Sequence, residues 1–179
     1  LAALTLLLWG RRGQAVFIAA AVLSATGLSH LVKALLGRTR PEQALALIET
    51  PTSYSLPSGH AFVTAVFLVA LVVLVWNQRS RRLRIGVVVT ALVVAVLVGL
   101  SRVYLGVHWT SDVLAGWCLA GVWSVLVATF LHRWRRSSWW LPRVKPWRGP
   151  VWRSAVVTIL LVALAVIVVL EAAADPLVR

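Results

Sequence analysis

The sequence predicts an all-α membrane protein, a polytopic helical bundle of about five to six spans. Of the 179 residues, 60% are hydrophobic and only 13% are charged, and a soluble domain carries roughly twice that share of charged residues. The apolar residues stand in long uncharged blocks of about 20 residues, enough to cross a bilayer as helices. These blocks fill nearly the whole chain, and its length permits one domain.

The expected elements follow one another as apolar blocks separated by short polar segments. The chain begins at Leu1 within an apolar run, so residues 1–9 are interpreted as the tail of a truncated span. Gly37 and Pro41 end the first complete span, since neither residue continues a helix. Complete spans are expected at residues 14–36, 60–76, 85–105, 112–131 and 155–170.

Three segments make up the expected domain organisation. Residues 1–131 form an N-terminally truncated functional core, 132–153 a basic cytoplasmic linker, and 154–179 an additional C-terminal transmembrane helix with its exit. The truncated start and the extra span indicate a chain cut from a larger membrane protein. We therefore expect it to be fused to, or associated with, further membrane domains.

The distribution of basic residues predicts the orientation of the spans. Thirteen of the 18 lysines and arginines fall on one side of the membrane, whereas all five acids fall on the other. The positive-inside rule makes the first side cytoplasmic. This orientation explains the net charge of +13, and nucleic-acid binding is not expected because no basic face with interleaved aromatic residues is present. We expect a bacterial-type inner (cytoplasmic) membrane.

The outer side nevertheless carries cations beside span ends, where ionisable groups are costly and point to function. Lys33 lies near the end of one span and Arg40 just past it. Arginine offers a fork of donors to phosphate oxygens and lysine offers a point charge, so the two side chains can reach one anion. Snorkelling of both cations at a helix end is the alternative.

A second segment, Pro57-Ser58-Gly59-His60, stands directly before an apolar helix. Ser58 is a plausible N-cap, and Gly59 lets the backbone approach a ligand closely. The free amides of the helix start form an anion site, which His60 would face from the first turn. The alternative is a simply capped helix start, although capping needs no histidine.

A third segment joins the next two spans, with Arg102 closing one and His108 opening the other. His108 and Asp112 are spaced i and i+4, so we expect them on one helix face. A carboxylate that holds one imidazole nitrogen fixes the tautomer and makes the other nitrogen a better nucleophile or base. A polar interfacial pair is the alternative.

Together these segments resemble the three-part signature of the type-2 phosphatidic acid phosphatase superfamily, which also includes vanadium haloperoxidases and bacterial acid phosphatases. The matching stretches are Lys33-x6-Arg40-Pro41, Pro57-Ser58-Gly59-His60 and Ser101-Arg102-x5-His108-x3-Asp112. Their order and spacings agree with the signature, and the resemblance covers residues 14–131.

The resemblance implies an all-helical core and a mechanism without a metal or other cofactor. His108 would attack phosphorus and form a phosphohistidine, Asp112 would orient it, and His60 would protonate the leaving oxygen. The phosphate oxygens would be held by Lys33, Arg40, Arg102, Ser58 and the amide of Gly59. Asp112 stands alone in the sequence, without the further acids that a metal site would need.

The spans favour a lipid phosphate as the substrate, presented by a head group at the periplasmic or exterior face. Undecaprenyl pyrophosphate is the leading candidate because it is released on this face in cell-wall synthesis, and phosphatidic acid, phosphatidylglycerol phosphate and a lipid A phosphate stay open. Residues 42–50 are expected to form a short interfacial helix beside the entry. A lipid phosphotransferase with the same phosphohistidine is a competing function, as is a non-catalytic anion-binding or transport module.

Overall fold

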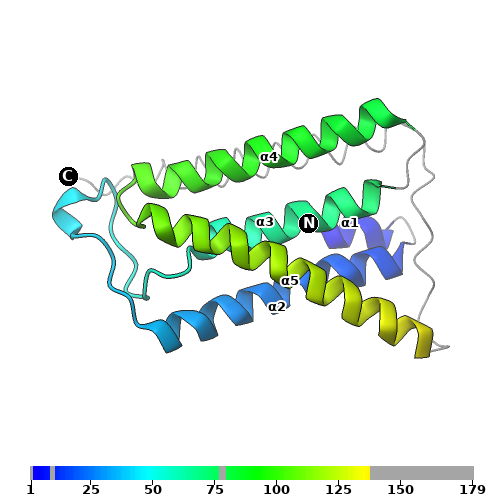
Figure 1. Cartoon of the computed structure of the whole chain (residues 1–179), viewed down its shortest axis with the longest axis horizontal. Coiled ribbons are helices and arrows are strands. Elements are labelled where there is room, and N and C mark those ends of the chain that lie inside the picture. Colours follow the sequence, from blue (N-terminus) through cyan, green and yellow to red (C-terminus); the bar gives the residue numbers. More distant parts are fainter. Residues whose placement is uncertain (1, 9–10, 77–79, 138–179) are drawn as a thin grey trace.

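A computed structural model describes residues 2–8, 11–76 and 80–137 of the chain, and the regular secondary structure within them is helical. The elements are α1 (Ala2–Leu8), α2 (Arg12–Leu36), the 3-10 turn η1 (Gln43–Leu45), α3 (Gly59–Val75), α4 (Arg81–Tyr104) and α5 (Thr110–Ser137). No strand occurs within these ranges, and the all-α prediction is confirmed (Figure 1). The expected span at 155–170 and most of the expected linker lie outside the described residues.

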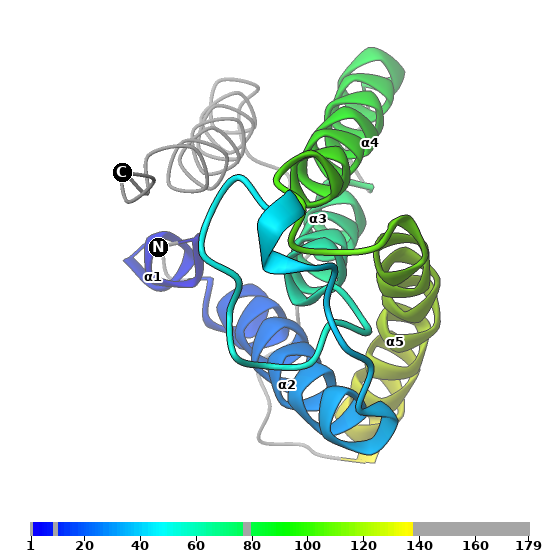
Figure 2. The same ribbon diagram turned by 90° about the vertical axis from the view of Figure 1, so that its left-hand side faces the viewer.

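The four long helices form a bundle in which α3 is the central member. It packs against α2, α4 and α5, while α1 packs on α2. The chain runs up and down, so the C-terminal ends of α2 and α4 meet the N-terminal ends of α3 and α5 at one end of the bundle (Figure 1, left). Figure 2 looks onto this end, where the loop between α2 and α3 lies across the helix ends. We call it the loop end.

Within the described part of the chain, three helices are long and apolar enough to cross a membrane, namely α2, α4 and the Thr110–Phe130 part of α5. The 25 residues of α2 extend about 37 Å, more than the roughly 30 Å of a hydrocarbon core. Large apolar side chains cover the outward faces, for example Leu23, which is 71% exposed. The apolar α3 is shorter, with 17 residues, and its neighbours surround it on three sides.

Small residues allow the helices to approach one another closely near the loop end. One buried cluster joins α2, α3 and α5 and consists of Ala21, Ala25, Phe62, Val66 and Ala120. Gly116 of α5 faces the first turn of α3, where an added Cβ would lie 3.1 Å from the carbonyl oxygen of Ser58. Close backbone approach of this kind is the usual role of small residues between membrane helices.

The start of α4 and the end of α5 extend furthest beyond the predicted spans, because capping and helix propensity outweigh residue polarity. The arginines expected in a basic turn at 77–84 lie partly in the first turn of α4, which Ser80 caps by accepting from the Leu83 amide at 3.3 Å. At the other end of the chain, α5 continues past the predicted end at Leu131 to Ser137. Arginine is a good helix former, so the basic residues there do not end the helix.

The interfacial helix predicted at 42–50 is wrong, since only the three residues of η1 form a helical turn. The chain then becomes extended, and the Leu47 amide donates to the carbonyl of Leu105 at 3.0 Å. In a helix over residues 42–50, the Leu47 amide would donate within the helix; here it binds the loop to the end of α4 instead.

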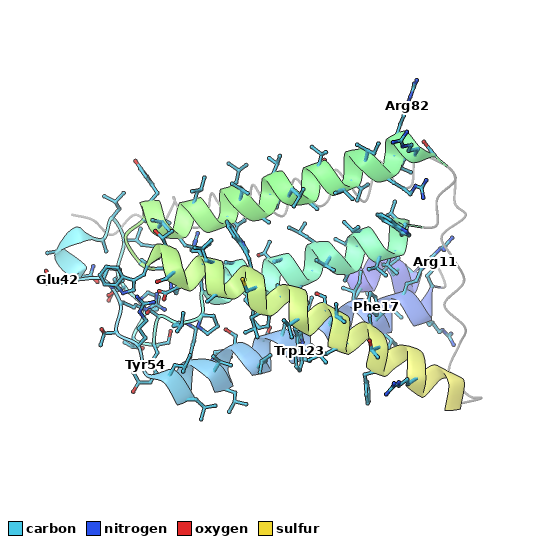
Figure 3. All side chains as sticks on the ribbon, viewed as in Figure 1. Arg11, Phe17, Glu42, Tyr54, Arg82 and Trp123 are labelled. Atoms are coloured by element: carbon cyan, nitrogen blue, oxygen red, sulfur yellow. The ribbon has the colours of Figure 1, made fainter. Side chains whose placement is uncertain are left out.

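Charged side chains differ between the two ends of the bundle. Glu42 lies at the loop end, whereas Arg11 and Arg82 lie at the opposite end (Figure 3). The two ends thus carry the charge asymmetry on which the predicted orientation depends.

Candidate active site

Each residue that the sequence assigned to the site lies at the loop end of the bundle. Lys33 is in the last turn of α2, Arg40 in the following loop, and His60 in the first turn of α3. Arg102 closes α4, and Asp112 is in the first turn of α5. The up-and-down course of the chain is what brings these four helix ends together.

The carboxylate of Asp112 is fully buried and contacts three donors. Its Oδ2 lies 3.4 Å from His108 Nδ1 and accepts from the Trp109 amide at 3.0 Å, while Oδ1 accepts from Arg38 at 2.7 Å. Since α5 begins at Thr110, His108 precedes the helix, and the prediction that both residues share a helix face is wrong. Asp112 instead reaches back to the residue before the helix, as the acidic member of a capping box does.

The position of Arg40 identifies the tautomer of His108. A guanidinium NH of Arg40 lies 3.2 Å from His108 Nε2, and a guanidinium can only donate. Nε2 therefore carries the lone pair and Nδ1 carries the proton, which faces Asp112. Burial, followed by the charges of Arg40 and Lys33, lowers the pKa of His108 to about 4 against the opposing effect of Asp112. His108 is neutral at pH 7.

Two acceptor residues hold the guanidinium of Arg40 in this position, Ser53 in the loop between α2 and α3 and Val107 in the connection between α4 and α5. Arg40 donates to the carbonyl and the hydroxyl of Ser53 at 2.8 Å and 3.1 Å, and to the carbonyl of Val107 at 2.7 Å. Burial lowers the pKa of Arg40 below its ordinary value, and the charge of Asp112 opposes this shift. Arg40 remains the fixed cation nearest to the imidazole lone pair.

Two further cations are buried beside the helix ends. Lys33 is 8% exposed, and its Nζ donates to the carbonyl of Tyr54 and lies 3.4 Å from that of Ser55. Arg102 is 5% exposed, and one of its terminal nitrogens has no hydrogen-bond partner among the described residues. A buried cationic donor without a partner is costly, so this nitrogen is suited to an anionic ligand.

The start of α3 combines a cap with a close contact. Ser58 caps the helix by accepting from the Ala61 amide at 3.5 Å, and its own amide donates to the carbonyl of Asp112 at 3.0 Å. An added Cβ on Gly59 would lie 3.3 Å from the Ser29 hydroxyl. The glycine therefore lets α3 approach α2 at the turn that carries Lys33.

His60 follows directly and is exposed at the loop end. The cations near enough to act on it electrostatically are Lys33, Arg40 and Arg102. Lys33 and Arg40 also act on His108, so the two histidines share these cations. The carboxylate of Asp112 is directed toward Arg38 and His108. The charge balance of the site favours an anion, and no cluster of three or more potential metal-ligating side chains occurs within the described ranges.

Arg38 is a site residue that the sequence reasoning missed. Its guanidinium pairs with Asp112 and lies 5.8 Å from the ring centroid of Trp109. A signal was available, because the residue before Pro41 is biased toward extended backbone. Side chains two residues apart in an extended segment point the same way, and this spacing could have placed Arg38 beside Arg40 at the site.

Comparison with known proteins identifies the family of this chain. The family model of the PAP2 superfamily matches residues 14–136. The chain belongs to the PAP2 superfamily. With its apolar helices, this PAP2 protein is a multi-pass membrane protein.

Two PAP2 relatives illustrate the similarity. The chain is 36% identical over 104 residues to an undecaprenyl-diphosphatase of Sulfolobus acidocaldarius, covering 54% of this chain and 44% of the relative. It is 37% identical over 116 residues to phosphatidylglycerophosphatase B of Bacillus subtilis, covering 61% and 54%. The chain thus spans about half the length of the curated relatives it matches.

A solved structure supports the PAP2 fold as well. The chain resembles the crystal structure of a transmembrane PAP2-type phosphatidylglycerolphosphate phosphatase from Bacillus subtilis, with a TM-score of 0.59 and 33% identity. The match covers 66% of this chain and 59% of the solved one.

Proposed function

We propose that this PAP2 protein is a membrane lipid phosphatase that removes the terminal phosphate of undecaprenyl pyrophosphate, with His108 as the nucleophile. The observation that carries the proposal is the lone pair on His108 Nε2, 3.2 Å from Arg40 and backed by Asp112. A neutral imidazole beside fixed cations can attack a phosphorus atom whose oxygens those cations hold.

In the proposed reaction, Lys33, Arg40 and Arg102 bind the terminal phosphate together with the Ser58 hydroxyl and the Gly59 amide. The Arg40 NH that contacts Nε2 donates its hydrogen bond to a phosphate oxygen instead, and arginine keeps its proton. The lone pair of Nε2 is then free to attack. The partnerless nitrogen of Arg102 gains an acceptor at the same time. These donors stabilise the negative charge on the equatorial oxygens of the transition state.

Nε2 of His108 then forms a bond to phosphorus, and the bond from phosphorus to the bridging oxygen breaks. The bridging oxygen leaves with the electron pair and receives a proton from His60. The phosphorylated imidazole keeps its proton on Nδ1, and Asp112 stabilises the resulting positive charge. Water next attacks phosphorus and gives its proton to His60, which releases phosphate and returns His108 to its neutral form.

The names of the relatives support a lipid substrate and a short set of alternatives. They include undecaprenyl-diphosphatase, phosphatidylglycerophosphatase B and, for Rhizobium etli, lipid A 1-phosphatase. Phosphatidylglycerol phosphate is the strongest competitor, because the similar solved structure also carries that name.

The charge distribution supports a site at the outer face of an inner (cytoplasmic) membrane. Arg11 and Arg82 lie at the end opposite to the site, and Glu42 lies at the loop end (Figure 3). The positive-inside rule would place the arginine-rich end in the cytoplasm and the loop end in the periplasm or outside the cell. Labelling a cysteine introduced at Glu42 in intact cells tests this orientation.

Phosphate release from the full chain in detergent with EDTA tests the function. Undecaprenyl pyrophosphate and phosphatidylglycerol phosphate are compared, with wild type and His108→Ala side by side. We expect faster release from undecaprenyl pyrophosphate, no release by the variant, and an acid-labile label on wild-type protein from substrate labelled in its terminal phosphate. Full activity of His108→Ala would disprove the nucleophile assignment, and faster release from phosphatidylglycerol phosphate would replace the proposed substrate.

A further inference from the structure

Arg38 and Asp112 form an ion pair that lies beside, rather than within, the proposed phosphate-binding region. The guanidinium donates to Asp112 Oδ1 at 2.7 Å and to the neighbouring Ser111 hydroxyl at 2.8 Å. The side chain of Asp112 is 0% exposed, whereas that of Arg38 is 37% exposed. Arg38 therefore closes the solvent side of a buried carboxylate.

Trp109 orients the two partners of this pair. The guanidinium of Arg38 lies 5.8 Å from the indole centroid, and the indole NH donates to the carbonyl of Thr39 at 3.2 Å. The backbone NH of Trp109 donates to Asp112 Oδ2 at 3.0 Å. One residue thus contacts the arginine, the loop that carries it and the second oxygen of the carboxylate.

The contact between Asp112 and His108 is the weakest of those made by the carboxylate. Oδ2 lies 3.4 Å from His108 Nδ1, beyond the usual range of an N–H···O hydrogen bond. That separation is too long to hold the carboxylate by itself. The rotation of the carboxylate is instead set by Arg38 on one oxygen and by the Trp109 amide on the other.

Arg38 and Arg40 occupy different positions relative to the imidazole. Arg40 contacts Nε2, the proposed attacking atom, whereas Arg38 contacts Asp112, the group behind Nδ1. One terminal nitrogen of Arg38 already donates to both the buried carboxylate and the Ser111 hydroxyl, so this nitrogen is directed toward Asp112. The contacts therefore favour an action of Arg38 through Asp112.

We propose that Arg38 is a positioning residue that holds the carboxylate of Asp112 toward His108 Nδ1. The inference rests on the proposed function, because it assigns Arg38 to the orientation of the proposed nucleophile. Pairing with Arg38 also keeps the carboxylate of Asp112 facing Nδ1 while the imidazole becomes positively charged during attack. Asp112 then stabilises the imidazolium from this fixed position.

The test compares Arg38→Ala and Arg38→Lys with wild type in the phosphate-release assay on undecaprenyl pyrophosphate. We expect Arg38→Ala to lower kcat by about 10- to 100-fold, the usual worth of a hydrogen bond to a charged group, with KM little changed. Arg38→Lys should recover part of kcat, because it restores the charge without the fork. Arg84→Ala is the matched control, since Arg84 also lies over a tryptophan, 5.9 Å from the ring centroid of Trp76, in the first turn of α4.

A double-mutant cycle with Asp112→Asn separates positioning from substrate binding. If Arg38 acts through Asp112, adding Arg38→Ala to Asp112→Asn lowers kcat no further. Multiplicative losses in the double variant would overturn the inference, as would a rise in KM at constant kcat in Arg38→Ala. If the activity of Asp112→Asn is too low to detect, the single variants decide the question. A lower kcat at constant KM in Arg38→Ala, with part of kcat recovered in Arg38→Lys, supports positioning, and a higher KM at constant kcat overturns it.

Two other outcomes separate the inference from the proposed function. Thermal unfolding of each variant in detergent identifies a purely structural role, in which the melting temperature falls while kcat of the folded protein stays at the wild-type value. That result refutes positioning by Arg38. If His108→Ala retains activity, the proposed function fails, whatever the behaviour of Arg38.

Discussion

Lowering the pH from 7.5 to 4 should affect stability through His108. Burial, followed by the charges of Arg40 and Lys33, lowers its folded-state pKa from 6.5 to about 4. Protons therefore bind the unfolded chain more tightly than the folded one. The stability associated with neutral His108 is fully present above pH 6.5 and is lost as the pH falls toward 4. A gap of about 2.5 pKa units corresponds to about 3 kcal/mol.

The measurement is the free energy of unfolding of wild type and His108→Gln in the same detergent across this pH range. Glutamine does not protonate, and both proteins keep the same carboxylates, so the difference between them isolates His108. We expect wild type to lose up to about 3 kcal/mol more than the variant between pH 6.5 and 4. Equal acid sensitivity of the two proteins would refute the burial argument.

Activity provides a second measure of the same group. Because the free enzyme determines kcat/KM, its acid limb should have a midpoint near pH 4 once the ionisation of the substrate is taken into account. A midpoint at pH 6.5 or above would mean that His108 is not held neutral by its surroundings.

Three further outcomes are expected. His60→Ala should lower kcat in phosphate-release kinetics by about 100- to 10,000-fold, because the leaving oxygen then lacks its acid and water lacks its base; a variant with the wild-type kcat would contradict both roles. Arg102→Ala should lower kcat/KM by about 100-fold or more and Arg102→Lys by less, and equal losses in phosphate-release kinetics would contradict recognition by charge. Gly99→Ala should destabilise the protein by about 1–3 kcal/mol, since its Cβ would collide with the ring of Trp117. Thermal unfolding checks this against Gly86→Ala, whose Cβ meets nothing within 4 Å.

Much of the site could be predicted because local sequence controls helix ends. Lys33 and Arg102 stand where apolar blocks stop, and Ser58 stands where one begins, as the helix bounds confirm. An up-and-down course then places alternate helix ends on the same side of the bundle. The approach of distant segments therefore followed from counting spans, without knowledge of any single contact.

The contacts within the site could not be predicted in the same way. The i, i+4 spacing of His108 and Asp112 indicated a shared helix face, yet the helix begins after His108 and the carboxylate caps it. The contacts of Arg38 with Asp112, and of Arg40 with His108, join residues about 70 positions apart. Such pairs depend on how a loop crosses the bundle, which no local pattern encodes.

By itself, the sequence determined an all-α membrane protein whose apolar blocks and charge asymmetry define the helices, and whose three motifs supply the ionisable residues of the site. Only the tertiary structure decided which of those residues touch. Apolar length and helix capping are local properties, set by burial and by backbone hydrogen bonds within a few residues. The pairing of Asp112 with Arg38, and of the imidazole lone pair with Arg40, instead depends on the close approach of α3 and α5 at Gly116 and on the loop laid across the helix ends.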